Sequence, residues 1–142
     1  MTHTSQRVHG SSVELAGQGI LILGPSGAGK SSLARDLVVL GARLIADDQT
    51  ILVGQGTTVT MTRPPSLPQG IELRGIGVVA CPMVDTAPLG VVVDLSQREP
   101  DRIPPQREYA VLDRKFPLIY GAGLDGLAQS LYLYVNHGRL PI

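Results

Sequence analysis

The feature that most constrains the fold is a glycine-rich loop placed between an apolar segment and a helical pattern. Residues 24–31 read Gly-Pro-Ser-Gly-Ala-Gly-Lys-Ser, which matches G-x-x-x-x-G-K-S at every fixed position. The continuous apolar run at residues 20–23 predicts a strand buried on both faces. After the loop, apolar residues recur at helical spacing up to Leu40, and Gly41 follows at a helix C-terminus. The sequence therefore predicts a P-loop that joins a strand to a helix.

A loop of this kind predicts a nucleotide phosphate site. Its glycines let several backbone N–H groups point inward, and the following helix adds its positive N-terminal end. Lys30 supplies a positive charge for the terminal phosphates of ATP, and the Ser31 hydroxyl is placed to bind magnesium. The residues expected to hold the nucleotide are Gly24, Pro25, Ser26, Gly27, Ala28, Gly29, Lys30 and Ser31.

The remaining patterns predict one α/β domain over residues 1–142, a length ordinary for a single core. Expected strands cover residues 13–16, 20–23, 43–46, 51–53, 57–61, 78–79 and 91–93, with turns at 17–19 and 54–56. Prolines and glycines predict irregular chain at 62–70 and between the last two strands, and residues 96–108 read as a mobile loop. Leu124, Leu127, Leu131, Tyr134 and Val135 indicate an amphipathic C-terminal helix.

Two strand ends offer the carboxylate that phosphoryl transfer needs. Asp94 ends the apolar strand at 91–93, while Asp47 and Asp48 end the strand at 43–46. Pattern alone does not separate them. Two adjacent acids cannot both face the core, and one that faces the phosphate beside a like charge suits a general base. We therefore favour the pair at 47–48, and a turn capped by Asp48 is the structural alternative.

Two further polar positions are ambiguous by themselves. Glu72 and Arg74 stand two apart between apolar neighbours and before Gly75 and Gly77, a pattern that fits an exposed ion pair or a close approach to a ligand. His9 near the start of the chain carries no signal of its own. The single cysteine, Cys81, is expected to have no catalytic role.

Charge and composition exclude several classes of partner. Lysine plus arginine equals aspartate plus glutamate, twelve of each, so no global field attracts nucleic acid or an anionic membrane. With one cysteine, no charged-then-apolar leader and no apolar run of membrane-spanning length, we expect a cytoplasmic location.

The order of these pieces resembles that in HPr kinase/phosphorylase, a bacterial enzyme that phosphorylates a serine of the phosphocarrier HPr. His9-Gly10, the loop, the segment Leu44-Ile45-Ala46-Asp47-Asp48 and the segment Glu72-Leu73-Arg74-Gly75-Ile76-Gly77 follow one another at matching separations, and Lys30 lies 21 residues after His9. The chain looks like the short alphaproteobacterial form without the N-terminal domain. The resemblance implies a mixed-sheet P-loop kinase similar in fold to phosphoenolpyruvate carboxykinase, with ATP and magnesium as cofactors.

The resemblance also implies roles for individual residues. Asp47 matches the base that takes the serine hydroxyl proton and returns it in the reverse reaction. Lys30 and His9 match further active-site positions, Ser31 and Glu72 match magnesium ligands, and Asp48 is a further candidate ligand. Asp101-Arg102-Ile103 is similar to the family's D-R-L, which makes Arg102 a candidate catalytic residue, although Pro104 replaces the family's glycine. Motifs for dephosphorylation are not recognisable, and a homo-oligomer stays open.

Three functions are compatible with the sequence. The first is a serine kinase acting on HPr or a nitrogen-system relative, with dephosphorylation as its reverse. The second is a small-molecule kinase with an arginine-rich lid, for which Arg98, Arg102, Arg107 and Arg114 are available. The third is a nucleotide-binding regulatory module without phosphotransfer. A GTPase is disfavoured because no N-K-x-D motif is present.

Overall fold

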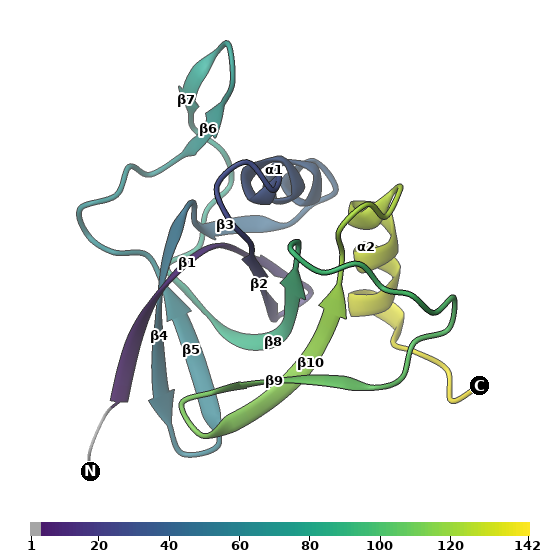
Figure 1. The fold of residues 1–142 in the computed structure, drawn as a ribbon. Coiled ribbons are helices and arrows are strands. Elements are labelled where there is room, and N and C mark those ends of the chain that lie inside the picture. Colours follow the sequence, from purple (N-terminus) through teal and green to yellow (C-terminus); the bar gives the residue numbers. More distant parts are fainter. Residues whose placement is uncertain (1–3) are drawn as a thin grey trace.

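The computed structural model describes residues 4–142 and combines a bent mixed sheet with two helices (Figure 1). The strands are β1 Thr4–Leu15, β2 Gln18–Leu23, β3 Arg43–Ala46, β4 Gln49–Gln55, β5 Thr58–Thr62, β6 Ile71–Leu73, β7 Gly77–Val79, β8 Thr86–Asp94, β9 Arg107–Val111 and β10 Arg114–Tyr120. The helices are α1 Lys30–Val39 and α2 Leu127–His137. No helix among residues 4–142 is long and apolar enough to cross a membrane.

Two long strands bend the main sheet. One end of β1 pairs with β4 and the other with β2 and β3, while β8 pairs first with β5 and then with β2 and β10. The pairing of β2 with β8 closes the path β2–β1–β4–β5–β8 into a ring. Because β2 runs parallel to β8, and β8 parallel to β10, the carboxyl ends of these three strands lie at one edge of the sheet.

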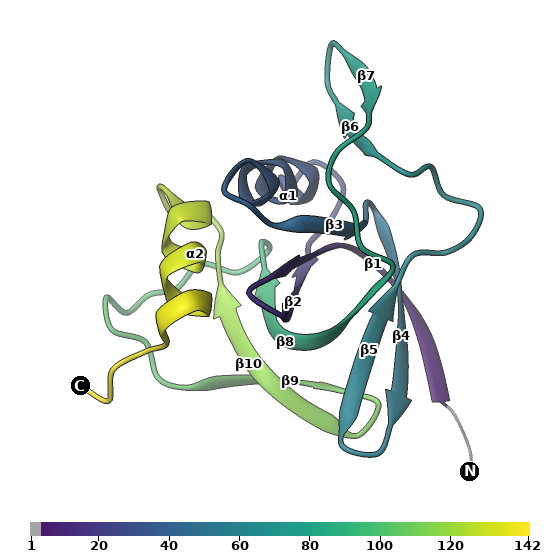
Figure 2. The same cartoon turned by 180° about the vertical axis from the view of Figure 1, so that it is seen from behind.

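Alternation along the central strands divides the apolar side chains between two cores. Ile20 and Ile22 of β2 face a core shared with both helices, whereas Leu21 faces the inside of the ring of strands. Both views show α1 and α2 beside one another against the sheet, while the small β6–β7 hairpin projects away past α1 (Figures 1 and 2). The edge of the sheet beside α1 is therefore flanked by elements whose apolar side chains are buried in a shared core.

Most of the expected elements are confirmed, with shifts at the turns. The strands at both predicted hairpins pair antiparallel, but the first turn is Ala16-Gly17 and not residues 17–19, and the second is Gly56-Thr57 and not residues 54–56. Ala16 adopts a left-handed conformation at φ 54, which the pattern of glycines did not suggest. Irregular chain at 63–70 and the helix after the loop are as predicted.

Three expectations on the second half of the chain are wrong. Residues 86–90, taken as loop, extend β8 despite Pro88, and Arg107 and Glu108, taken as the end of the loop at 96–108, open β9. The β9–β10 hairpin was not predicted, because its two-residue turn is Leu112-Asp113, both left-handed, without the usual glycine or asparagine. Leu124 lies before α2, which begins at Leu127.

An ion pair between the nearly buried Glu14 and the half-exposed Arg43 makes stability depend on pH. Burial opposes ionisation of Glu14, but the N–H of Gly17 and the Arg43 side chain donate to its carboxylate, each at 2.7 Å, and the charge of Arg43 adds to this. Together they hold the pKa of Glu14 below its ordinary value of 4.5. A depressed folded-state pKa contributes stability above the unfolded value, and that stability is lost as pH falls through the folded value.

We therefore expect Glu14→Gln to lower the free energy of unfolding by about 1 kcal/mol at neutral pH. The difference from the wild type should shrink as pH falls below 4.5 in urea titrations. Glu108→Gln, on the exposed side of β9, is the matched control and should change little. A Glu14→Gln deficit that persists unchanged at low pH would contradict this assignment.

Candidate active site

The glycine-rich loop leaves the carboxyl end of β2 in a conformation that only glycine adopts easily. Gly24, Gly27 and Gly29 have φ values of 153, 84 and 102 degrees. No side chain caps the first turn of α1, so the N–H groups of that turn are not taken by a capping residue. The loop therefore presents backbone donors and the positive end of a helix at the edge of the sheet.

Lys30 is held beneath this loop. Its side chain is only 6% exposed, and the ammonium Nζ donates to the carbonyl oxygens of Gly24, at 2.8 Å, and Pro25, at 3.1 Å. These are neutral acceptors, so no carboxylate neutralises the charge through those bonds. A small rotation of the side chain would bring the ammonium to an anion seated in the loop.

Asp47 is the point at which four elements meet. Its Oδ1 accepts the Ser31 hydroxyl of α1 at 2.7 Å and the Ser11 hydroxyl of β1 at 2.9 Å. Its Oδ2 accepts the backbone N–H of Glu72 in β6 at 3.2 Å. The carboxylate is thus fixed in orientation, and since a carboxylate has about four acceptor positions, one on Oδ2 is left for another donor.

The two adjacent acids point in different directions, as the sequence required. Asp48 has a left-handed backbone at φ 75, and its carboxylate Oδ1 lies 2.7 Å from Nε2 of His9. Both side chains of this pair are about half exposed, so its contribution to stability is small. The structure therefore brings Asp47 to Ser31, and joins His9 to the site only through Asp48.

The competing strand-end acid is occupied locally. Asp94 Oδ1 accepts the N–H and the hydroxyl of Ser96, at 2.8 and 2.6 Å, which closes a turn after β8. Within residues 4–142, no hydrogen bond joins Asp94 to Ser31 or Lys30. The position of the two acids accordingly favours Asp47 as the carboxylate of the site.

The side chains of the other predicted residues are less closely tied to the loop and to Asp47. The side chain of Glu72 is exposed, and Arg74 falls in the turn after β6, so the two do not share a strand face. Arg102 is exposed in the irregular segment before β9, where no hydrogen bond within the described chain links it to the loop or to Asp47. Burial raises the pKa of the Cys81 thiol, and the charge of Asp47 adds to the effect, which disfavours a nucleophilic thiolate.

Sequence reasoning missed one residue of the site, Ser11. It is fully buried, donates to Asp47 and accepts the backbone N–H of Asp48 at 3.1 Å, so it holds both acids to β1. Its neighbour Ser12 is also fully buried and bonds Thr50 at 2.9 Å. Two consecutive hydroxyl residues between His9-Gly10 and a buried strand were the available signal, because buried polar side chains need partners.

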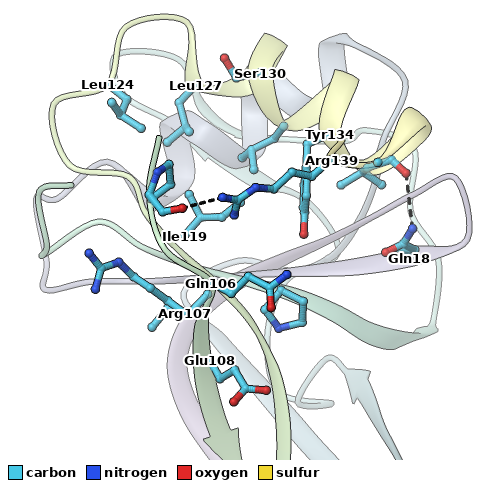
Figure 3. Close-up of a pocket in the computed structure, with 16 residues that line it drawn as sticks. Gln18, Gln106, Arg107, Glu108, Ile119, Leu124, Leu127, Ser130, Tyr134 and Arg139 are labelled. Carbon is cyan, nitrogen blue, oxygen red and sulfur yellow. Dashed lines mark hydrogen bonds between the residues drawn. The ribbon is translucent and has the colours of Figure 1, made fainter. Parts of the chain in front are cut away.

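Two cavities flank α2, and only one of them touches the loop. The larger, about 660 Å³, lies between α2 and the β9–β10 hairpin and includes Arg107, Tyr134 and Arg139 (Figure 3). No residue of the glycine-rich loop lines it. The smaller, about 280 Å³, has Ala28 and Gly29 in its wall. The candidate active site therefore occupies the edge formed by the loop, Asp47 and the smaller cavity.

This fold and site define an α/β protein that presents a glycine-rich loop, a lysine and an oriented carboxylate at one edge of a mixed sheet. The sequence matches the family model described as HPr Serine kinase C-terminal domain over residues 2–100. The chain belongs to the HPr serine kinase C-terminal domain family.

Relatives and a solved structure agree with this placement. The chain is 47% identical over 73 residues to an HPr kinase/phosphorylase of Lactobacillus johnsonii and 42% identical over 76 residues to one of Chlorobium chlorochromatii. These matches cover 51% and 52% of this chain and 23% of each relative, so the chain spans about a quarter of the length of the relatives it matches.

The fold is similar to that of the Hpr(Ser) kinase/phosphatase from Coxiella burnetii, with a TM-score of 0.78 at 22% identity. The match covers 92% of this chain and 94% of that chain. It extends past residue 100, where the family model ends, so the arrangement of the C-terminal part has a structural counterpart.

The Lys30 ammonium leads to a binding prediction. Replacing Lys30 by alanine should weaken tripolyphosphate binding in calorimetry by about 10- to 100-fold, the effect of losing one charge-assisted hydrogen bond. Lys115, the only other lysine of the chain, lies exposed on β10, and Lys115→Ala is the matched control. Equal affinity of the two variants would show that the loop does not use this ammonium.

Proposed function

We propose that this chain is an ATP- and magnesium-dependent protein-serine kinase whose acceptor is HPr or a nitrogen-system relative of HPr. The observation that carries the proposal is the 2.7 Å hydrogen bond between Ser31 and Asp47, which ties the phosphate loop to a carboxylate that could activate a hydroxyl. The membership of the HPr serine kinase family supports a serine hydroxyl of a phosphocarrier protein as the acceptor.

The loop and Lys30 would bind the phosphoryl donor, ATP. Backbone N–H groups of residues 24–31 and the ammonium of Lys30 would surround the terminal phosphates of ATP. Lys30 would exchange two neutral carbonyl partners for phosphate oxygens, and a charged acceptor makes the stronger hydrogen bond. The loop would thus position the γ-phosphoryl group toward Asp47.

Two residues near the loop would supply oxygen ligands to a magnesium ion. The Ser31 hydroxyl donates its hydrogen to Asp47, which leaves its oxygen lone pairs free for a cation, and the Glu72 carboxylate belongs to a residue whose N–H adjoins the site. Magnesium keeps several waters and phosphate oxygens, so two protein ligands suffice. When bound, it would neutralise charge on the transferring phosphoryl group. Asp48 is less well placed, because its carboxylate bonds His9.

The acceptor half depends on Asp47. The serine hydroxyl would donate to the open position on Oδ2, at the side of the carboxylate away from Ser31 and Ser11. As the serine oxygen forms its bond to the γ-phosphorus, the bond from that phosphorus to the bridging oxygen of ADP breaks and the hydroxyl proton passes to Asp47. In the reverse direction, which remains a prediction, Asp47 would return the proton.

The small-molecule kinase finds less support. Of the four arginines that an arginine-rich lid would use, Arg107 pairs with Glu99 at 2.9 Å and Arg114 donates to the carbonyl of Gly56 at 2.7 Å. Both are therefore committed to the fold. Arg98 and Arg102 alone would make a sparse lid for a charged acceptor.

The first test concerns the base. Asp47→Asn should reduce phosphoryl transfer to an HPr-type protein by about 10² to 10⁴-fold while ATP binding is kept, because the amide retains an acceptor for Ser31 but cannot take a proton. Label transfer from γ-labelled ATP and calorimetry measure the two effects. Asp94→Asn, the same change at the other strand end, is the control and should stay near wild type. Transfer undiminished in Asp47→Asn would rule out this base.

The second test concerns Ser11, a positioning residue that acts through Asp47. Ser11→Ala removes one donor from the carboxylate and should lower kcat by about tenfold, the equivalent of one hydrogen bond, with little change in KM for ATP. Ser11→Thr restores the hydroxyl and should recover most of the rate. A Ser11→Thr variant as slow as Ser11→Ala would mean that packing, and not the hydrogen bond, sets the rate.

A further inference from the structure

We infer that the 280 Å³ cavity beside the start of α1 is the pocket for the purine base of the nucleotide. The inference rests on the proposed function and adds the position of the base, which the loop motif does not give. Residues from four segments line the cavity: Ala28, Gly29, Ser32, Leu33, Asp36, Leu95, Gly121, Ala122, Gly123, Leu124, Gly126, Leu127, Ala128 and Gln129.

The direction of the triphosphate follows from the sheet order. β2, which leads into the loop, has β1 and then β3 on one side, and β8 and then β10 on the other. Asp47 follows β3, so the terminal phosphate belongs on the β3 side of the loop. A chain of phosphates that begins there and crosses the loop must continue toward the carboxyl ends of β8 and β10.

The cavity lies where that path leads. Leu95 directly follows β8, and the turn at 121–124 directly follows β10, and both line the cavity together with the loop. Ligands of open α/β sheets bind outside the carboxyl ends of the parallel strands, which is the edge in question. The larger 660 Å³ groove shares Leu124 and Leu127 with this cavity but has no residue of the loop in its wall.

Size and lining suit a base. Pockets for whole drug-sized ligands measure about 300–1,000 Å³, so 280 Å³ fits one part of a nucleotide and not all of it. Leu95 and Leu127, both half-buried, provide aliphatic surface for one face of a flat ring, and the rest of the lining is mostly polar. The glycines at 121 and 123 keep the opposite wall thin, and the N–H of Ala122 is bonded to the carbonyl of Gln97 at 3.0 Å, which fixes that turn.

Polar groups at the rim match the edge of a purine. Ser32 and Asp36 stand one helical turn apart on α1 and face the same cavity. The Asp36 carboxylate could accept a hydrogen bond from an amino or imino group of the base. Its present partner is the neighbouring Arg35, at 2.9 Å with both side chains half exposed, and such a pair is easily given up. Gln129 offers both a donor and an acceptor on the α2 side.

The test compares ATP with tripolyphosphate, which has the phosphates but no base. Ala122→Phe puts a ring into the cavity and should raise the Kd for ATP by at least about tenfold, while the Kd for tripolyphosphate stays at its wild-type value. Unchanged tripolyphosphate binding also shows that the variant is folded. Ala110→Phe, on an exposed position of β9, is the matched control and should bind both ligands as the wild type does.

A second variant removes a polar group from the rim of the cavity and adds no bulk to it. Asp36→Ala removes an exposed side chain and should weaken ATP binding by about tenfold without weakening tripolyphosphate. The inference is overturned if the wild type binds ATP no more tightly than tripolyphosphate, or if Ala122→Phe binds ATP as well as the wild type. In both cases the proposed kinase still stands, whereas a wild type that binds neither ligand overturns the kinase as well.

Discussion

The structure depends on one carboxylate with three donors. Ser31, Ser11 and the N–H of Glu72 reach Asp47 from α1, β1 and β6, and no two of these elements are neighbours in the chain. A buried or half-buried carboxylate needs such partners, and each of them is held by a different part of the fold. These contacts set the orientation of the carboxylate beside the phosphate loop. Asp47 therefore both links three elements of the fold and presents the carboxylate of the candidate site.

The rest of the fold positions the loop and the donors around Asp47. The long β1 carries Ser11 at the start of its pairing with β2, two residues after its pairing with β4 ends at His9, and the buried apolar run of β2 leads directly into the loop. The left-handed backbone of Asp48 turns the second acid outward, so that it bonds His9 and does not compete for Ser31. One end of the sheet therefore offers a single oriented carboxylate beside the loop.

Hydrophobic periodicity and turn residues were sufficient to predict the loop, its strand and helix, and both N-terminal hairpins. These features are decided by local sequence. The β9–β10 hairpin escaped because its turn is Leu112-Asp113, without a glycine, and leucine rarely adopts the left-handed conformation that it has here. Ser11 escaped because its partners lie 36 and 37 residues away, and a strand pattern gives no pairing register. The pair at 47–48 was favoured from its strand end, whereas the choice of Asp47 within the pair and the role of Glu72 came from resemblance, and only the tertiary structure brings the backbone N–H of Glu72 to Asp47.

The measurement that tests the central claim most directly is the intact mass of an HPr-type protein after incubation with this chain, ATP and magnesium. The account predicts a mass increase of one phosphoryl group, located on a serine by fragmentation and dependent on all three components. An unchanged acceptor mass, under conditions in which the chain binds ATP, would contradict a protein-serine kinase and leave a small-molecule kinase or a nucleotide-binding module.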